Sequence, residues 1–160
     1  MSKRLMLLAC SAVLLFSAPA MAEELYSGSA LSPETVGTRI TQPEAGTIRV
    51  DTASPTAVNL ADVDVREKKL EETTLKYSAK LKTEGLDGAA FLEMWVHFSG
   101  ANKGSYFSRG LDQQVTGDAD WTAVSIPFVL QKGQVPDRVT LNLQVNGKGA
   151  VLIKDVKLSD

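Results

Sequence analysis

Apolar and polar residues alternate with a period of two along most of the chain after residue 46. In AFLEMWVHF (residues 90–98), every second residue is apolar and would face a core, as in a half-buried β-strand. LKYSAKLK (75–82) and RVTLNLQV (138–145) repeat this pattern. After residue 22 no segment of useful length has the 3.6-residue period of a helix. The alternation therefore predicts a series of strands.

Shorter segments add further strands. They are expected at residues 47–50, 56–60, 62–65, 105–111, 121–130 and 150–158. The apolar phase of 62–65 is shifted by one residue relative to 56–60, which indicates a bulge or two separate strands. Pro127 favours an edge strand or a bulge, because proline cannot donate to a strand ladder.

The connections are marked by turn-forming and charged residues. TEGLDG (83–88) and the dipeptide Asn146-Gly147 predict turns, the second a tight hairpin turn. The charged residues 66–74 predict a loop or one short helical turn. Residues 23–45 are rich in Ser, Gly, Pro, Thr and Glu, and we expect them to be mostly irregular, with a short strand near 38–41.

Short strands spaced by turns, without helices, define an all-β fold. We expect a single two-sheet jelly-roll β-sandwich over residues 46–160, preceded by a signal peptide and the irregular segment 23–45.

Residues 1–22 have the layout of a secretory signal peptide: Lys3 and Arg4, an apolar run over 5–16, and Ala20-Met21-Ala22. The apolar run is shorter than the roughly 20 residues that a membrane-spanning helix needs. A lipoprotein signal ending at Cys10 is the alternative, but the apolar stretch before this cysteine is short. Cleavage after Ala22 predicts a periplasmic or secreted protein, and it would remove the only cysteine and with it any disulfide.

The charge of the chain limits its partners. The net charge is −2 for the whole sequence and becomes −4 when Lys3 and Arg4 are removed. A mildly acidic domain without a basic cluster is a poor candidate for binding nucleic acid. No segment after the signal peptide approaches the length of a transmembrane segment.

The polar face of the 90–98 strand carries the most promising chemistry. It presents a carboxylate, an indole and the only histidine of the chain. Aromatic rings stack on the apolar face of a sugar, while carboxylate, amide and guanidinium groups bind its hydroxyls. Similar side chains share one phase on the 105–111 and 138–145 strands, and they would join this face if the strands lie in one sheet. The candidate ligand-binding residues are Glu93, Trp95, His97, Phe107, Arg109, Asn142 and Gln144.

A second interpretation of this face stays open. It would be the solvated side of the sheet, with Trp95 half covered by a loop. Trp121 is expected to be a core or rim anchor rather than a platform for a ligand.

Residues for catalysis are few. His97 is the only histidine, and YFSRG lacks the first glycine of a nucleophile elbow. A zinc site needs several histidine or cysteine ligands. Hydrolysis of a glycosidic bond would require Glu93 to converge with another acid such as Asp112 or Asp155. The sequence therefore predicts a protein that is not an enzyme.

No cofactor is expected either. Asp62, Asp64 and Asp155 leave a structural calcium ion open, because they carry suitable oxygen ligands, but the spacing of an EF-hand loop is absent.

Three segments resemble known domains. LKYSAKLKTEGLDGAAFLEMWVHF, DWTAVSIPF and VTLNLQVNGKGAVLIKDVKL resemble the galactose-binding-like jelly rolls, including carbohydrate-binding modules. The similarity covers residues 47–158. This sequence has Lys154 where such domains often have a first aspartate. The resemblance implies a non-catalytic domain whose partner is a glycan or another small polar ligand. The alternatives are a cell-envelope module that binds a protein partner and, third, a glycan hydrolase.

Overall fold

The computed structural model describes residues 22–28, 38–100 and 103–160. The expected signal peptide thus lies outside the described residues, apart from Ala22. The strands are β1 (Glu24–Ser27), β2 (Thr38–Glu44), β3 (Thr47–Thr52), β4 (Thr56–Asp64), β5 (Thr74–Phe98), β6 (Gly104–Arg109), β7 (Val115–Val129) and β8 (Arg138–Ser159), with one 3₁₀ turn, η1 (Arg66–Lys68). In these ranges, no helix has the length and apolar character needed to cross a membrane.

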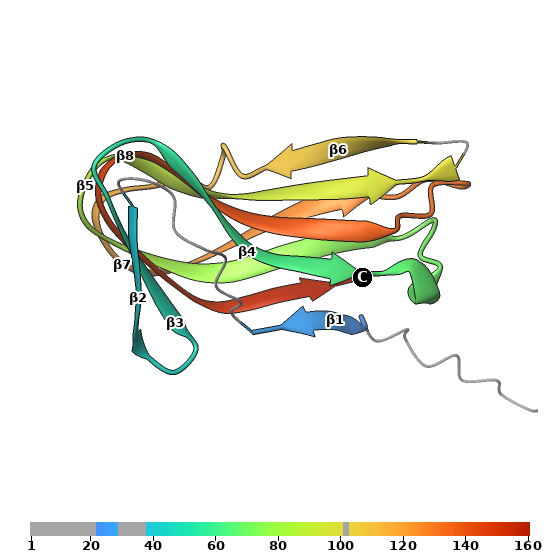
Figure 1. Cartoon of the computed structure of the whole chain (residues 1–160), viewed down its shortest axis with the longest axis horizontal. Coiled ribbons are helices and arrows are strands. Elements are labelled where there is room, and N and C mark those ends of the chain that lie inside the picture. The colour runs from blue at the N-terminus through green and yellow to red at the C-terminus, as the bar shows by residue number, and fades with distance from the viewer. Residues whose placement is uncertain (1–21, 29–37, 101–102) are drawn as a thin grey trace, which may run out of the picture.

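The eight strands form one continuous antiparallel sheet in which β8 is the most connected strand. It pairs with β1, β3, β4 and β5. β5 also pairs with β6 and β7, and β2 pairs with β3. The two long strands β5 and β8 lie side by side and bend together at the same end of the molecule (Figure 1).

The bend folds this sheet into two layers. Residues 89–98 of β5 and 138–146 of β8 form one layer with β4 and β6, which we call the Glu93 layer. Residues 74–84 of β5 and 149–159 of β8 form the other with β1, β3 and β7, which we call the Lys80 layer. The Tyr77 hydroxyl donates a hydrogen bond to the carbonyl oxygen of Asn142 across the layers at 3.4 Å. The all-β sandwich predicted from the sequence is confirmed.

Alternation along the strands creates the core between the layers. Leu92, Met94 and Val96 of the Glu93 layer are at most 1% exposed, and so are Leu75 and Tyr77 of the Lys80 layer. They belong to a single cluster of buried apolar residues. Complete burial of an aliphatic or aromatic side chain contributes about 1.5–3 kcal/mol, so the two inward faces hold the layers together.

Two glycines permit the bend. Gly88 of β5 and Gly147 of β8 are opposite each other, with φ angles of +133° and +144°. A Cβ on Gly88 would lie 1.7 Å from the carbonyl oxygen of Asn146, and one on Gly147 would lie 1.7 Å from that of Asp87. The turns predicted at 83–88 and at Asn146-Gly147 are therefore wrong. Here the glycines let two paired backbones bend in close contact without interrupting either strand.

The other connections agree with the sequence except near the N-terminus. The register of β4 shifts between Asn59 and Ala61, where a bulge was one of the two alternatives. Pro127 lies on β7, which pairs only with β5 in the described part of the chain. Segment 23–45 is expected to be mostly irregular, with a short strand near 38–41. β2 includes this strand, whereas β1 was not predicted. Pairing with β8 stabilises β1, and this segment of four residues has no alternation of its own that would reveal it.

Candidate ligand-binding face

The seven candidate residues lie together on the outer surface of the Glu93 layer. They come from the three neighbouring strands β5, β6 and β8. Glu93 is opposite Arg109 on one side and Asn142 on the other, and Trp95 is opposite Phe107. The strands thus meet the condition set by the sequence, since they belong to one layer. We call this surface, formed by Glu93, Trp95, His97, Phe107, Arg109, Asn142 and Gln144, the Trp95 face.

Glu93 is the centre of the Trp95 face and is only 2% exposed. Its Oε1 accepts hydrogen bonds from Trp95 Nε1 at 2.7 Å, Gln144 Nε2 at 2.8 Å and Asn142 Nδ2 at 3.2 Å. Its Oε2 accepts a hydrogen bond from Arg109 Nε, which also forms an ion pair with it. Burial by itself would raise the pKa of Glu93, but these four donors outweigh burial and lower the pKa below its usual value. Glu93 therefore stays ionised and fixes the side chains around it.

Aromatic and cationic groups form a continuous row beside Glu93. The Trp95 and Phe107 ring centroids are 5.0 Å apart, with the planes tilted by 48°. The Arg109 guanidinium carbon lies 4.5 Å from the centroid of the Phe107 ring. Trp95 is half-buried, whereas Phe107 is 51% exposed. The row thus offers an apolar surface to solvent with a cation at one end.

His97 is held at the other side of Trp95 by two hydroxyl groups. Its Nδ1 lies 2.7 Å from Ser105 Oγ, and its Nε2 lies 2.9 Å from Thr140 Oγ1. Because the Thr140 hydroxyl donates its one hydrogen to Asp62 Oδ1 at 2.5 Å, it accepts from Nε2–H of the histidine. Ser105 then donates to Nδ1, and His97 is a neutral imidazole with both nitrogens engaged.

We predict that His97 titrates below its usual value of about 6.5. Burial lowers its pKa, and the positive charge of Arg138 adds to this, while Asp62 opposes it. The unfolded chain thus binds this proton more readily, so the contribution of His97 to stability is complete above about pH 6.5 and is lost as the pH falls. NMR titration can measure this pKa without assignment, because the chain has one histidine. A pKa above that of the urea-unfolded protein would contradict the prediction.

The acids considered for catalysis or calcium have other partners. Glu93 is surrounded by donors, Asp155 forms an ion pair with Lys80 in the other layer at 2.9 Å, and Asp112 lies in the turn after β6. Asp62 accepts from Thr140, and Asp64 pairs with Arg66. Across residues 22–28, 38–100 and 103–160, no group of three or more His, Cys, Asp or Glu residues could hold a metal ion.

Trp121 lies near the middle of β7 and is half-buried. The Lys154 ammonium lies 4.1 Å from the centroid of its indole ring. Lys154 thus covers Trp121.

Sequence reasoning missed the residues that support the Trp95 face. Thr140 and Ser105 hold His97, and Asn59 of β4 donates a hydrogen bond to Asn142 Oδ1 at 3.5 Å. Alternation places Thr140 on the same side of its strand as Asn142, so this residue could have been found. The pairing of β4 with β8, which brings in Asn59, carries no signal of comparable strength.

The bent two-layer sheet places the domain in a known structural class, the all-β jelly-roll fold of carbohydrate-binding modules. No protein-family model and no curated protein matches the sequence. Among solved structures, the CBM22-1–GH10 modules of Clostridium thermocellum endo-1,4-β-D-xylanase 10B, complexed with xylohexaose, match with a TM-score of 0.60 and 15% identity over 88% of this chain. This chain covers 29% of that one.

Two isolated modules show the same fold. The CBM22-1 xylan-binding domain of Paenibacillus barcinonensis Xyn10C matches with a TM-score of 0.55 and 14% identity, covering 89% of this chain and 97% of that one. A family 16 carbohydrate-binding module matches with a TM-score of 0.51 and 13% identity, over 78% of this chain and 86% of that one.

Proposed function

We propose that this protein is an exported, non-catalytic carbohydrate-binding domain and that the Trp95 face contacts the glycan. The observation that carries the proposal is the aromatic row of Trp95 and Phe107 next to amide and guanidinium donors on one rigid surface. Export, to the periplasm or the medium, is proposed from residues 1–22 alone.

The groups of the Trp95 face would make different kinds of contact with the glycan. Trp95 and Phe107 would stack against the apolar face of one or two sugar rings. Arg109 uses Nε to bind Glu93, so its terminal nitrogens can donate to sugar hydroxyls. Asn142 and Gln144 each donate a hydrogen bond from the amide nitrogen to Glu93, and these bonds fix the orientation of both side chains.

Glu93 and His97 are positioning residues in this proposal. Their polar atoms form hydrogen bonds with neighbouring side chains, and the carboxylate of Glu93 is almost completely buried. Such enclosure limits the motion of Trp95 and Arg109 before any ligand arrives, which lowers the entropy lost on binding.

We predict that, in a glycan-array screen of residues 23–160, Phe107→Ala weakens binding of neutral glycans about tenfold and Trp95→Ala abolishes it. A stacked aromatic contributes about 0.5–1.5 kcal/mol beyond its buried area, and a loss of 1.4 kcal/mol is tenfold. Tyr106→Ala is the matched control. Tyr106 is 55% exposed on the same strand but points to the opposite side, where it contacts Phe98. Equal binding by all the folded variants would exclude the Trp95 face as the site.

A protein partner is the second candidate. β6 is an edge strand of the described sheet, since it pairs only with β5, and it exposes both Tyr106 and Phe107. Exposed aromatic residues on an edge strand are suited to a partner that adds a strand of its own. A wild-type protein that is folded and binds no glycan on the array would favour this function.

A further inference from the structure

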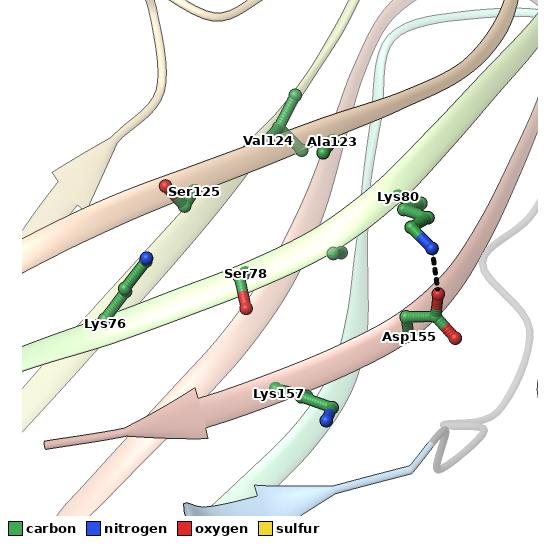
Figure 2. Close-up of a pocket in the computed structure, with 9 residues that line it drawn as sticks. Lys76, Ser78, Lys80, Ala123, Val124, Ser125, Asp155 and Lys157 are labelled. Carbon is green, nitrogen blue, oxygen red and sulfur yellow. Dashed lines mark ion pairs between the residues drawn. The ribbon is translucent and has the colours of Figure 1, made fainter. Parts of the chain in front are cut away.

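A groove of about 540 Å³ lies on the outer surface of the Lys80 layer (Figure 2), and none of the residues that line it belongs to the Trp95 face. Its walls come from the three strands β5, β7 and β8, and the residues that line it are Lys76, Ser78, Ala79, Lys80, Ala123, Val124, Ser125, Asp155 and Lys157. It thus forms a concave surface that is separate from the Trp95 face.

The groove exists because small and long side chains alternate across the strands. Ser78 on β5 is opposite Ser125 on β7, and Lys80 is opposite Ala123. Ser78, Ser125 and Ala123 have small side chains and form the floor of the groove, and the lysine side chains flank it. The serine hydroxyls give the floor hydrogen-bonding groups.

The charge of the groove is opposite to that of the whole chain. Three lysines and one aspartate line it, which gives +3 − 1 = +2, whereas the chain carries −2. Lys80 pairs with Asp155 at 2.9 Å, and Lys157 pairs with Glu24 at 3.3 Å. The four side chains in these pairs are 49–53% exposed, so each pair is weak and can be exchanged for an anion of a ligand. Lys76 has no ion-pair partner in the described part of the chain.

The cations form a row. Lys76, Lys80 and Lys82 share one phase of β5, and Lys157 fills the gap because it is opposite Ser78. A two-residue step along a strand is roughly 7 Å, so positive charges stand at four successive positions over three steps, the fourth being Lys82 just beyond the groove. A row of this kind fits an extended polyanion better than a single small anion.

We propose that this groove binds a linear carboxylated polysaccharide, a chain of uronic acid sugars. The lysines would pair with its carboxylates, and Ser78, Ser125 and Asp155 would bind its hydroxyls. Asp155 disfavours a ligand that carries only negative charge, whereas a ligand with hydroxyls can donate to it. The floor has no exposed aromatic or large apolar side chain to hold the bases of a nucleic acid or the side chains of a peptide.

Calorimetric titration with an oligogalacturonate of defined length tests the proposal, with its fully methyl-esterified form as a neutral probe of the same backbone. We expect the acid to bind, the ester to bind at least tenfold more weakly, and added salt to weaken binding of the acid. Replacing three exposed lysines (K76Q/K80Q/K157Q) should weaken it about thirtyfold, since each contact of this kind is worth about threefold.

Two matched variants separate this site from general charge and from the Trp95 face. The triple variant K68Q/K69Q/K132Q removes the same charge from exposed loop positions and should bind the acid as the wild type does. Trp95→Ala should also bind it unchanged, so the two sites can fail independently. Thermal unfolding of each variant checks that it is folded.

Three results would overturn the proposal. One is equal binding of the ester and the acid. Another is unchanged binding by the folded K76Q/K80Q/K157Q variant. The third is equal binding of poly-L-glutamate, which would show a surface that recognises charge without recognising a sugar.

Discussion

Replacing Gly147 by alanine is expected to destabilise the domain by about 4 kcal/mol or more, a large part of the roughly 5–15 kcal/mol by which a domain is usually stable. The new Cβ would lie 1.7 Å from the carbonyl oxygen of Asp87, so β5 and β8 would have to separate at their bend. Alanine is also strained at the φ of +144° that this residue adopts. Urea unfolding followed by circular dichroism measures the loss.

Gly46→Ala is the control for backbone strain. Gly46 has a φ of +78°, but a Cβ there would meet no atom within 4 Å. We expect this variant to lose only about 1 kcal/mol. If Gly147→Ala lost no more than Gly46→Ala, the close approach of the two strands would not be needed for the fold.

Replacing Glu93 by alanine is expected to lower the free energy of unfolding by about 3 kcal/mol. Four donors would lose their acceptor at once, and hydrogen bonds to a buried charged group are worth about 1.5–3 kcal/mol. The loss is limited because Arg109 is 41% exposed and can be rehydrated.

Glu84→Ala is the matched control, because Glu84 is a second carboxylate of β5 that pairs with an arginine, Arg49, but is 43% exposed. It should cost at most about 1 kcal/mol. Equal losses from the two substitutions would contradict the role of Glu93 as the centre of its face.

Glu93 also makes the stability of the folded protein depend on pH. The pKa of Glu93 is lower in the folded protein than in the unfolded chain. Its contribution to stability is therefore complete above the unfolded value of about 4.3 and is lost as the pH falls through the folded pKa. The alanine variant should lose less stability over that range than the wild type.

The alternation of apolar and polar residues was sufficient to predict the fold class and the sides of β5 and β8 that face the core. Leu92, Met94 and Val96 are buried as expected. It also placed Glu93, Trp95 and His97 on one surface, and strand phase added Phe107 and Gln144. Phase works here because the period of a strand is two residues and each side of the layer meets a different environment.

What the sequence could not predict depends on contacts between distant segments. Gly88 and Gly147 resemble turn residues in isolation, and only their mutual close approach turns them into the bend of two continuous strands. The groove was hidden for a similar reason. The outward lysines of β5 were visible, but the small residues of β7 and the position of Lys157 that make a hollow come from pairing.

The central position of β8 also determines the order in which the protein can fold. Four strands, β1, β3, β4 and β5, pair with β8, which comes after all of them in the sequence. Until β8 has left the ribosome, the earlier strands have unpaired edges and neither layer can be completed. Folding is therefore delayed until β8 has been synthesised, and its rate is limited by contacts between segments far apart in the chain. During that interval, the unpaired edges and exposed apolar residues of the earlier strands make the chain prone to aggregate.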